Sequence, residues 1–343
     1  MKKILALILA LSMTFALVSC FGGDDDDVTV GPAKTTVENA AEWEAAFDED
    51  LLSTAVIEIT LDGAGDGNGV SISYVYEVSP KSIYSKVDMS LSLEGGTSVT
   101  KVESNITDMA LAEVLTSMTG GSGNDSLSDL GLDVATLQVF ADLFDKATYA
   151  DGKYTITGTF DEDDDGNVVI DPNGTDSCTI EFANGKLSKV TIRATEDGDV
   201  SVVTFAFSKY GKTGARPVSD EIVTAYTEAK AGVTANVGAY LDGVEINVSD
   251  AQAILAKFSK DDVKCYADTY SAYSMEGYSN VQDMTMIFFN ATGETLTVAG
   301  AAVPCQVLGA LIEDGAIIQL YLINGDITTD PSAMKIIDLA YEQ

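Results

Sequence analysis

The chain contains no histidine, a single tryptophan, four cysteines, and only 19 lysines and arginines against 54 aspartates and glutamates among its 343 residues. Without histidine it cannot build a Ser-His-Asp or Cys-His catalytic group, a histidine-ligated zinc site or an imidazole general base. An enzyme would need paired carboxylates, and nothing in the sequence selects one pair from so many acids. We therefore predict a protein that is not an enzyme.

The shortage of basic residues gives a formal net charge of −35. Nucleic-acid binding and electrostatic docking on anionic lipid both require basic patches, so the sequence predicts neither. Cationic ligands, divalent metals and basic partners remain compatible with this charge, although a solvated acidic surface is the simpler interpretation. Hydrophobic residues make up 46% of the chain, which is enough for a packed core.

Long hydrophobic runs are also scarce. Lys2 and Lys3 precede an apolar run from Ile4 to Leu17, which has the length of a signal-peptide core and is too short for an easy membrane span. The next most apolar stretch, residues 303–323, is interrupted by four polar or charged residues: Gln306, Glu313, Asp314 and Gln319. We expect no membrane-spanning segment after the first run.

The first apolar run ends in Leu17-Val18-Ser19-Cys20, which resembles the lipobox of bacterial lipoprotein precursors. In that family the cysteine thiol is alkylated with diacylglycerol and the chain is cut just before the cysteine. The resemblance implies that residues 1–19 are a signal peptide and that Cys20 is the lipidated first residue. It also implies a lipid-anchored protein on the extracytoplasmic face of the cell membrane, since two acyl chains, palmitate among them, anchor stably.

Residues 20–37 read as a tether. Phe21-Gly22-Gly23 and the four aspartates Asp24 to Asp27 cannot bury apolar surface and should stay solvated. A metal site at these aspartates is the alternative, but no second element fixes its geometry.

Residues 38–214 begin with a short amphipathic helix, Glu38–Phe47, and then show mainly alternating strand patterns. The predicted strands are VIEITL, VSISYVYEV, SIYSKVDMSLSL, SVTKVES, KYTITGTF, CTIEF, KLSKVTIRA and VSVVTFAF, with DGAGDGNG as a hairpin loop after the first. Between them, two helices are predicted from apolar residues at helical spacing: Leu111, Val114, Leu115 and Met118, then Leu137, Phe140, Ala141 and Phe144. This order predicts an α+β fold, a curved antiparallel sheet with helices packed on one face.

That element order, with the hairpin FANGKLSKVTI and the closing FAFSKYGKT, resembles the LolA-like and LprG-like group of bacterial lipid-handling proteins. The resemblance implies a half-barrel with an apolar cavity for a lipid or other amphiphile, lined by Leu111, Leu115, Phe140 and Phe144. Plain core packing of the helices against the sheet explains the same apolar stripes, and we favour it for the stripes themselves.

One loop has the beginning of a calcium site. Asp161, Asp163 and Asp165, followed by Gly166, match the first half of an EF-hand loop. The match fails at the position of the bidentate glutamate, which is Pro172, and strand patterns flank the loop. An acidic hairpin loop is therefore the favoured interpretation, and weak calcium binding is the alternative; no other cofactor is predicted.

Three cysteines remain besides Cys20. Cys178 lies in phase with Ile180 and Phe182, so we expect it in the core. Cys265 and Cys305 could pair outside the cytoplasm, but spacing alone cannot establish that they are close.

A turn-rich segment, GKTGARPVSDE, separates residues 38–214 from a second predicted domain at residues 217–343, mixed α/β and of no recognised family. Ser219 should cap a helix running from Glu221 towards Leu241, and Ala251–Phe258 and Ala333–Tyr341 read as further helices. DMTMIFFNAT and AIIQLYLI read as strands, while ETLTVAGAAVPCQVLGAL is ambiguous.

Together these observations predict a lipid-anchored protein that binds a lipid or amphiphile without catalysis. The alternative is a cell-envelope interaction or adhesion module with no ligand cavity. The sequence predicts neither a ligand identity nor an oligomeric state.

Overall fold

The computed structural model describes residues 36–48, 51–52, 54–65, 68–79, 82–93, 95–108, 111, 137, 140–141, 143–162, 168–171, 174–196, 199–211, 216–233, 236–325 and 330–341. The predicted signal peptide, Cys20 and most of the tether lie outside these residues, as does most of the predicted helical pair at residues 111–144.

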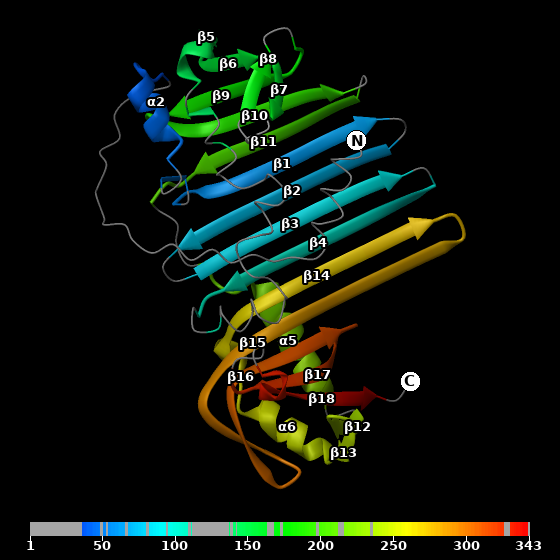
Figure 1. Cartoon of the computed structure of the whole chain (residues 1–343). Coiled ribbons are helices and arrows are strands. Elements are labelled where there is room, and N and C mark those ends of the chain that lie inside the picture. The colour runs from blue at the N-terminus through cyan, green and yellow to red at the C-terminus, as the bar shows by residue number, and fades with distance from the viewer. Residues whose placement is uncertain are drawn as a thin grey trace.

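Sixteen strands of the described residues form one open, curved sheet in which every pairing is antiparallel (Figure 1). In spatial order they are β13 (Val244–Ile246), β12 (Asn236–Leu241), β18 (Met334–Tyr341), β17 (Ala316–Ile323), β16 (Ala301–Glu313), β15 (Tyr278–Val298), β14 (Val263–Met275), β4 (Gly96–Ile106), β3 (Ser82–Leu93), β2 (Asn68–Ser79), β1 (Val56–Gly65), β11 (Asp199–Ser208), β10 (Lys186–Glu196), β9 (Ser177–Ala183), β6 (Lys153–Thr157) and β5 (Thr148–Ala150). A separate hairpin pairs β7 (Thr159–Glu162) with β8 (Val168–Asp171).

Helices are few in the described part of the chain. The α-helices are α2 (Ala40–Ala46), α5 (Asp220–Gly232) and α6 (Val248–Ala256), and the 3₁₀ turns are η3 (Phe144–Lys146), η5 (Lys260–Asp262) and η6 (Pro331–Ala333). The fold is therefore α+β and built mainly on an antiparallel sheet, as the sequence predicts.

Alternation and turn chemistry explain the strands of the first half. In β1, Ile57, Ile59 and Leu61 are buried while Glu58 is exposed. β1 pairs with β2 from Gly65 opposite Asn68 onwards, so most of the predicted DGAGDGNG loop belongs to strands. The turn between β9 and β10 is Asn184-Gly185, with φ of 56° and 75°, which suits a two-residue hairpin.

Helix α2 packs against one face of the sheet, named here the α2 face. Trp43 is fully buried there among the side chains of β1, β9 and β11, and its Nε1 donates a hydrogen bond to the carbonyl oxygen of Phe140 at 2.7 Å. The tyrosine hydroxyl of Tyr154 donates to the carbonyl of Val37 at 2.9 Å. These contacts fix the start of the described chain to the sheet.

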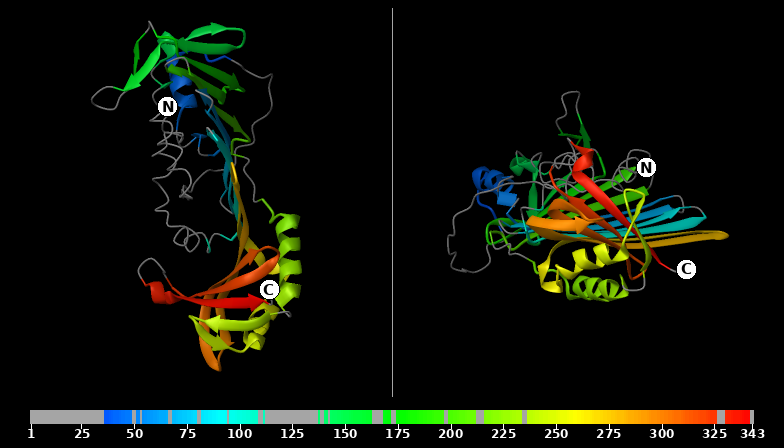
Figure 2. Two further views of the ribbon diagram at one scale, coloured as in Figure 1. Left: turned by 90° about the vertical axis from the view of Figure 1, so that its right-hand side faces the viewer. Right: turned by 90° about the horizontal axis from the view of Figure 1, so that it is seen from below.

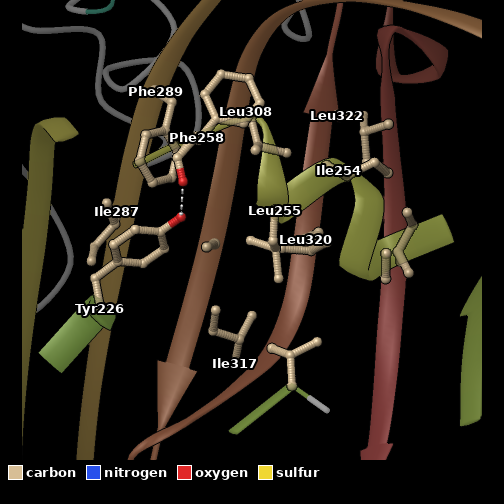
Figure 3. Packing of buried hydrophobic residues seen from close by; sticks show 14 of the residues in the cluster. Tyr226, Ile254, Leu255, Phe258, Ile287, Phe289, Leu308, Ile317, Leu320 and Leu322 are labelled. Carbon is tan, nitrogen blue, oxygen red and sulfur yellow. Dashed lines mark hydrogen bonds between the residues drawn. The ribbon is translucent and has the colours of Figure 1, made fainter. Parts of the chain in front are cut away.

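Helices α5 and α6 pack against the opposite face, named the α5 face, at the other end of the sheet (Figure 2). Ser219 caps α5, with its side chain accepting a hydrogen bond from the amide of Ile222. Figure 3 shows the cluster beneath these helices, where the Tyr226 hydroxyl donates to the carbonyl of Phe258 at 3.0 Å. The helices therefore cover opposite faces at opposite ends of the sheet.

The two predicted domains share this sheet. β4 pairs with β14 in one unbroken register, from Ile106 opposite Cys265 to Gly96 opposite Met275. A third hydrophobic cluster, on the α2 face, mixes residues of both segments, including Ile83, Ile106 and Phe288. The hydrogen-bonded ladder thus crosses the segment boundary without interruption.

Two helix predictions in the second half are wrong: one helix ends earlier than predicted, and the other is a strand. Helix α5 ends at Gly232 rather than near Leu241, because residues 236–241 form β12, which pairs with β18. The predicted terminal helix is strand β18, which is inserted between β12 and β17. The ambiguous stretch of the sequence forms the end of β15 and the start of β16.

The three cysteines of the described residues are buried and free. Cys178 lies in the cluster beneath α2, as predicted. Cys265 belongs to the cluster on the α2 face and Cys305 to the cluster beneath α5, so the sheet separates their side chains. The structure therefore excludes the disulfide that the sequence left open.

We expect all three thiols to resist alkylation in the folded protein. Burial raises the pKa of Cys265 to about 12 and that of Cys305 to about 11, so almost no thiolate is present at pH 8. Peptide mass mapping should find Cys178, Cys265 and Cys305 unlabelled by iodoacetamide in native protein and fully labelled in guanidinium chloride. Labelling of any of them in folded protein would contradict this arrangement.

Candidate functional site

Strands β14 and β15 continue past the end of β16 (Figure 1). Pairing between β15 and β16 starts at Met284 opposite Glu313, whereas pairing between β14 and β15 extends to Met275 opposite Tyr278. Glu276 and Gly277 connect the two strands, and Gly277 has a φ of 79°, a conformation that glycine adopts without strain. We name the protruding residues 273–283 the hairpin tip; every one of them is exposed.

The hairpin tip exposes large apolar side chains. The exposed fractions are 39% for Tyr273, 46% for Met275, 57% for Tyr278 and 62% for Val281, and the neighbouring Leu93 is 45% exposed. Single exposed apolar residues are ordinary, but a contiguous group of them marks a surface for interaction.

Strand register brings four of these five side chains together. Leu93, Met275 and Tyr278 lie in one row across the sheet, with Gly96 between the first two, and Tyr273 lies in the next row on the same face. The rings of Tyr273 and Tyr278 are 6.1 Å apart, and the Tyr273 hydroxyl donates to Met275 Sδ at 3.1 Å. Val281 points to the other face. The tip is thus apolar on the α2 face and has one apolar residue behind it.

Gly96 keeps this row compact. A Cβ atom at this position would lie 2.9 Å from the carbonyl oxygen of Ser274 and 3.3 Å from Met275 Cβ. A side chain there would push β14 away from β4, so glycine permits the close approach that supports the tip.

The outer edge of the hairpin tip is open. Within the described residues, Tyr278–Asp283 pair only with β14. In an antiparallel pair alternate residues direct both backbone groups towards the partner strand, so the others direct theirs to the free side. Natural edges are commonly protected by charged side chains, proline or bulges. The segment YSNVQD has one charged residue, Asp283 at its end, and no proline, and its register with β14 is regular.

The hairpin tip itself has charge of one sign. Residues 273–283 contain two acids, Glu276 and Asp283, and no lysine or arginine. On the neighbouring strands, Lys101 lies opposite Tyr270, and Lys86 lies 4.0 Å from Asp88, farther from the turn. The candidate surface is therefore apolar at its centre and acidic at its rim.

A partly buried ion pair lies on the α5 face of β2 and β3. Arg216 Nε donates to Glu77 Oε2 at 2.6 Å, its guanidinium lies 3.7 Å from the ring centroid of Tyr84, and Glu77 is 4% exposed. Asn105 Nδ2 donates to the carbonyls of Arg216 and Pro217. These contacts hold Arg216 and Pro217, which precede α5, against β2, β3 and β4. We therefore assign the contacts a structural role.

Beside this ion pair lies a group of acids. The Tyr266 hydroxyl donates to Glu103 Oε1 at 2.7 Å, and Thr285 Oγ1 donates to Asp268 Oδ1 at 2.5 Å. Burial raises the pKa of the Asp268 carboxyl, and the nearby Asp283 carboxylate adds to the rise. No group of three or more acids or cysteines suited to a metal ion occurs among the described residues. The geometry here supports a polar surface rather than a metal centre.

A shallow hollow of about 440 Å³ lies where β11, β1, β2 and β3 end. Small residues create it, among them Gly63, Ala64, Gly69 and Ser71, and Ser71 Oγ donates to Asp62 Oδ1 at 2.7 Å. A hollow lined by small side chains offers little apolar area to an amphiphile.

The described residues predicted to line a lipid cavity belong to two hydrophobic clusters on the α2 face, and Tyr76 packs against both. Leu111 is buried in the cluster with Cys265 and Phe288, whereas Phe140 and Phe144 pack in the cluster around Trp43. Leu115 lies outside the described residues. The described members of the set thus serve two hydrophobic clusters, and a shared cavity stays a prediction.

The predicted calcium loop lies between paired strands. Asp161 is in β7, opposite Val169 of β8, while Asp163 and Asp165 lie outside the described residues. Flanking strands agree with the acidic hairpin that we favour, because an EF-hand loop joins two helices. Calcium binding by this loop stays a prediction.

No protein-family model matches the chain, and no curated protein matches it in sequence. No helix within the described ranges is long and apolar enough to cross a membrane.

Sequence reasoning missed the hairpin tip. A signal was present: residues 270–283 read YSAYSMEGYSNVQD, rich in the tyrosine, serine, glycine and asparagine that antibody recognition loops favour. The protrusion itself depends on the lengths of three strands, which the sequence does not define.

Proposed function

We propose that the chain is a lipoprotein anchored through Cys20 on the extracytoplasmic face of the membrane, where it binds a macromolecular partner without catalysis. The exposed hairpin tip is the observation that favours an interaction module. Its large apolar side chains are held outside the body of the protein, which costs the isolated protein favourable burial. A partner that covers them regains that contribution.

The absence of histidine supports binding over chemistry, as does the lack of a suitable metal-ligand group in the described part of the chain. The acidic tether supports an anchored protein held away from anionic headgroups. Both arguments come from residue chemistry and are independent of the tip.

Crosslinking and lipid labelling test this proposal in the cells that produce the protein. A photoreactive amino acid at Tyr278, which is 57% exposed, should give a discrete crosslinked adduct, while the same group at Tyr240, a tyrosine of β12 that is 38% exposed, should not. Cys20→Ala should abolish incorporation of a palmitate analogue. An equal crosslinking pattern at both positions would refute a binding role for the tip, and labelling of the Cys20→Ala protein would refute the anchor.

Lipid or amphiphile binding in a LolA-like half-barrel is the second candidate. It is favoured by partly buried apolar side chains on the α2 face of the central strands, Val70, Val87 and Met89, beside the small buried pair Leu61 and Ile72. Mass spectrometry of protein extracted from native membranes is the test. A stoichiometric lipid other than the Cys20 anchor would support this candidate, and its absence would leave the interaction module.

A further inference from the structure

We infer that the partner binds by strand addition: an extended, basic polypeptide segment pairs with the free edge of β15 at Tyr278–Asp283. This inference rests on the proposed function and names the binding mode and chemistry of its partner.

The backbone of this edge is ready for pairing. Six residues of strand span about 20 Å, enough for an added strand of ordinary length. The two-residue connection closes on Met275 opposite Tyr278, and counting outwards from this pair places Val281 among the residues that direct N–H and C=O away from β14. An incoming strand would satisfy these groups as in other complexes formed by strand addition.

The side chains next to the edge would contact an added strand on both faces. Tyr278 and Asn280 lie on the α2 face of β15, and Val281 lies on the α5 face. Cross-strand contacts with aromatic and β-branched residues contribute about 0.2–1 kcal/mol per pair. Because Tyr278 and Val281 are both more than half exposed, an added strand has apolar area to bury on each face.

Charge selects the partner. The hairpin tip contains two acids, Glu276 and Asp283, and no basic residue, and the chain as a whole has a net charge of −35. A second copy of the chain or an anionic lipid surface would be repelled over the range of this field, whereas lysines and arginines on the partner strand would be attracted. We therefore assign the edge to a basic protein segment.

Peptides with a defined backbone test strand addition directly. The probe is a set of fluorescent eight-residue peptides in which lysine alternates with valine, tyrosine or threonine. The purified full-length protein in detergent should bind at least one of them in a polarisation assay. N-methylation of alternate residues, which removes N–H donors but keeps the charge, should weaken binding by about tenfold or more, because two or three hydrogen bonds are lost. Glutamate in place of lysine should abolish binding.

A matched pair of variants locates the site. Val281→Pro removes the outward N–H and should weaken binding by about tenfold, whereas Val281→Thr keeps the N–H and the β-branched shape and should bind within about twofold. Thermal unfolding of both variants checks that the fold survives. In wild-type protein, hydrogen exchange at residues 278–283 should slow when the peptide is bound, which does not depend on any variant.

Several results would overturn the inference. These are no binding by any lysine peptide, equal binding of the N-methylated peptide, or unchanged exchange at residues 278–283. Self-association that Val281→Pro abolishes would assign the edge to a second copy instead. If the peptides do not bind but Tyr278 still gives a specific crosslink in cells, strand addition is rejected and the proposed function is kept. If the peptides do not bind and the crosslink is also absent, both are rejected.

Discussion

Replacing Trp43 by alanine is expected to lower the free energy of unfolding by about 4 kcal/mol, the typical cost of truncating a large buried aromatic side chain. Trp43 is fully buried, and its ring lies 5.2–5.7 Å from those of Phe47, Phe144, Tyr154 and Phe182. The truncation would leave a cavity between α2 and the sheet and would remove the hydrogen bond to the Phe140 carbonyl. Urea unfolding followed by far-ultraviolet circular dichroism measures the change.

Two controls separate the cavity from the hydrogen bond. Trp43→Phe keeps most of the apolar volume but leaves the Phe140 carbonyl without this donor, so we expect a smaller loss of about 1–2 kcal/mol. Tyr240→Ala removes an exposed aromatic ring and should change the free energy of unfolding by about 0.5 kcal/mol or less. Equal losses for Trp43→Ala and Tyr240→Ala would show that α2 is not docked as described.

Replacing Arg216 by methionine is expected to lower the free energy of unfolding by about 2 kcal/mol, because the buried carboxylate of Glu77 would lose its charge-assisted hydrogen bond to the guanidinium. Arg216 is the partner of Glu77 at 2.6 Å and also stacks on Tyr84. Its loss would leave Asn105 to hold the segment leading into α5 against the central strands. Chemical unfolding again provides the measurement.

A double variant that replaces both members of the ion pair gives the decisive comparison. Glu77→Leu combined with Arg216→Met removes the buried charge as well as its partner, so the double variant should recover most of the lost stability. Lys86→Met, which breaks a surface pair with Glu103 at 3.6 Å, should cost about 1 kcal/mol at most. A double variant no more stable than Arg216→Met would show that the buried Glu77 carboxylate is not the cause.

Local patterns predicted most strands of the first half, although the predicted strand KYTITGTF is divided between β6 of the large sheet and β7 of the separate hairpin. β1 and β9 alternate apolar and polar residues because one face is covered and the other faces solvent. The Asn184-Gly185 turn has the positive φ angles that its residue types favour. The helix cap predicted at Ser219 also forms, with the side chain accepting a hydrogen bond from the amide of Ile222.

The second half was harder to predict because some of its strands have apolar side chains on both faces of the sheet. In β18, Ile337 and Leu339 are buried towards α5 while Ile336 is partly buried on the α2 face. With apolar residues on both faces the alternation disappears, and the run resembles a helix. Pairing of β4 with β14 left no sequence signal either, so the hairpin tip, whose position depends on that pairing, could not be predicted.

The single sheet also constrains how the chain folds. The strands β1 to β4 join through short hairpins, but each side of this meander is completed by one distant pairing: Val56 with Ser208 on one side and Ile106 with Cys265 on the other. Closing loops of about 150 residues is entropically costly and slows folding. The meander of β1 to β4 should therefore form before β11 pairs with β1 and before β14 pairs with β4. Until β14 is paired, β4 is itself an open edge of the sheet.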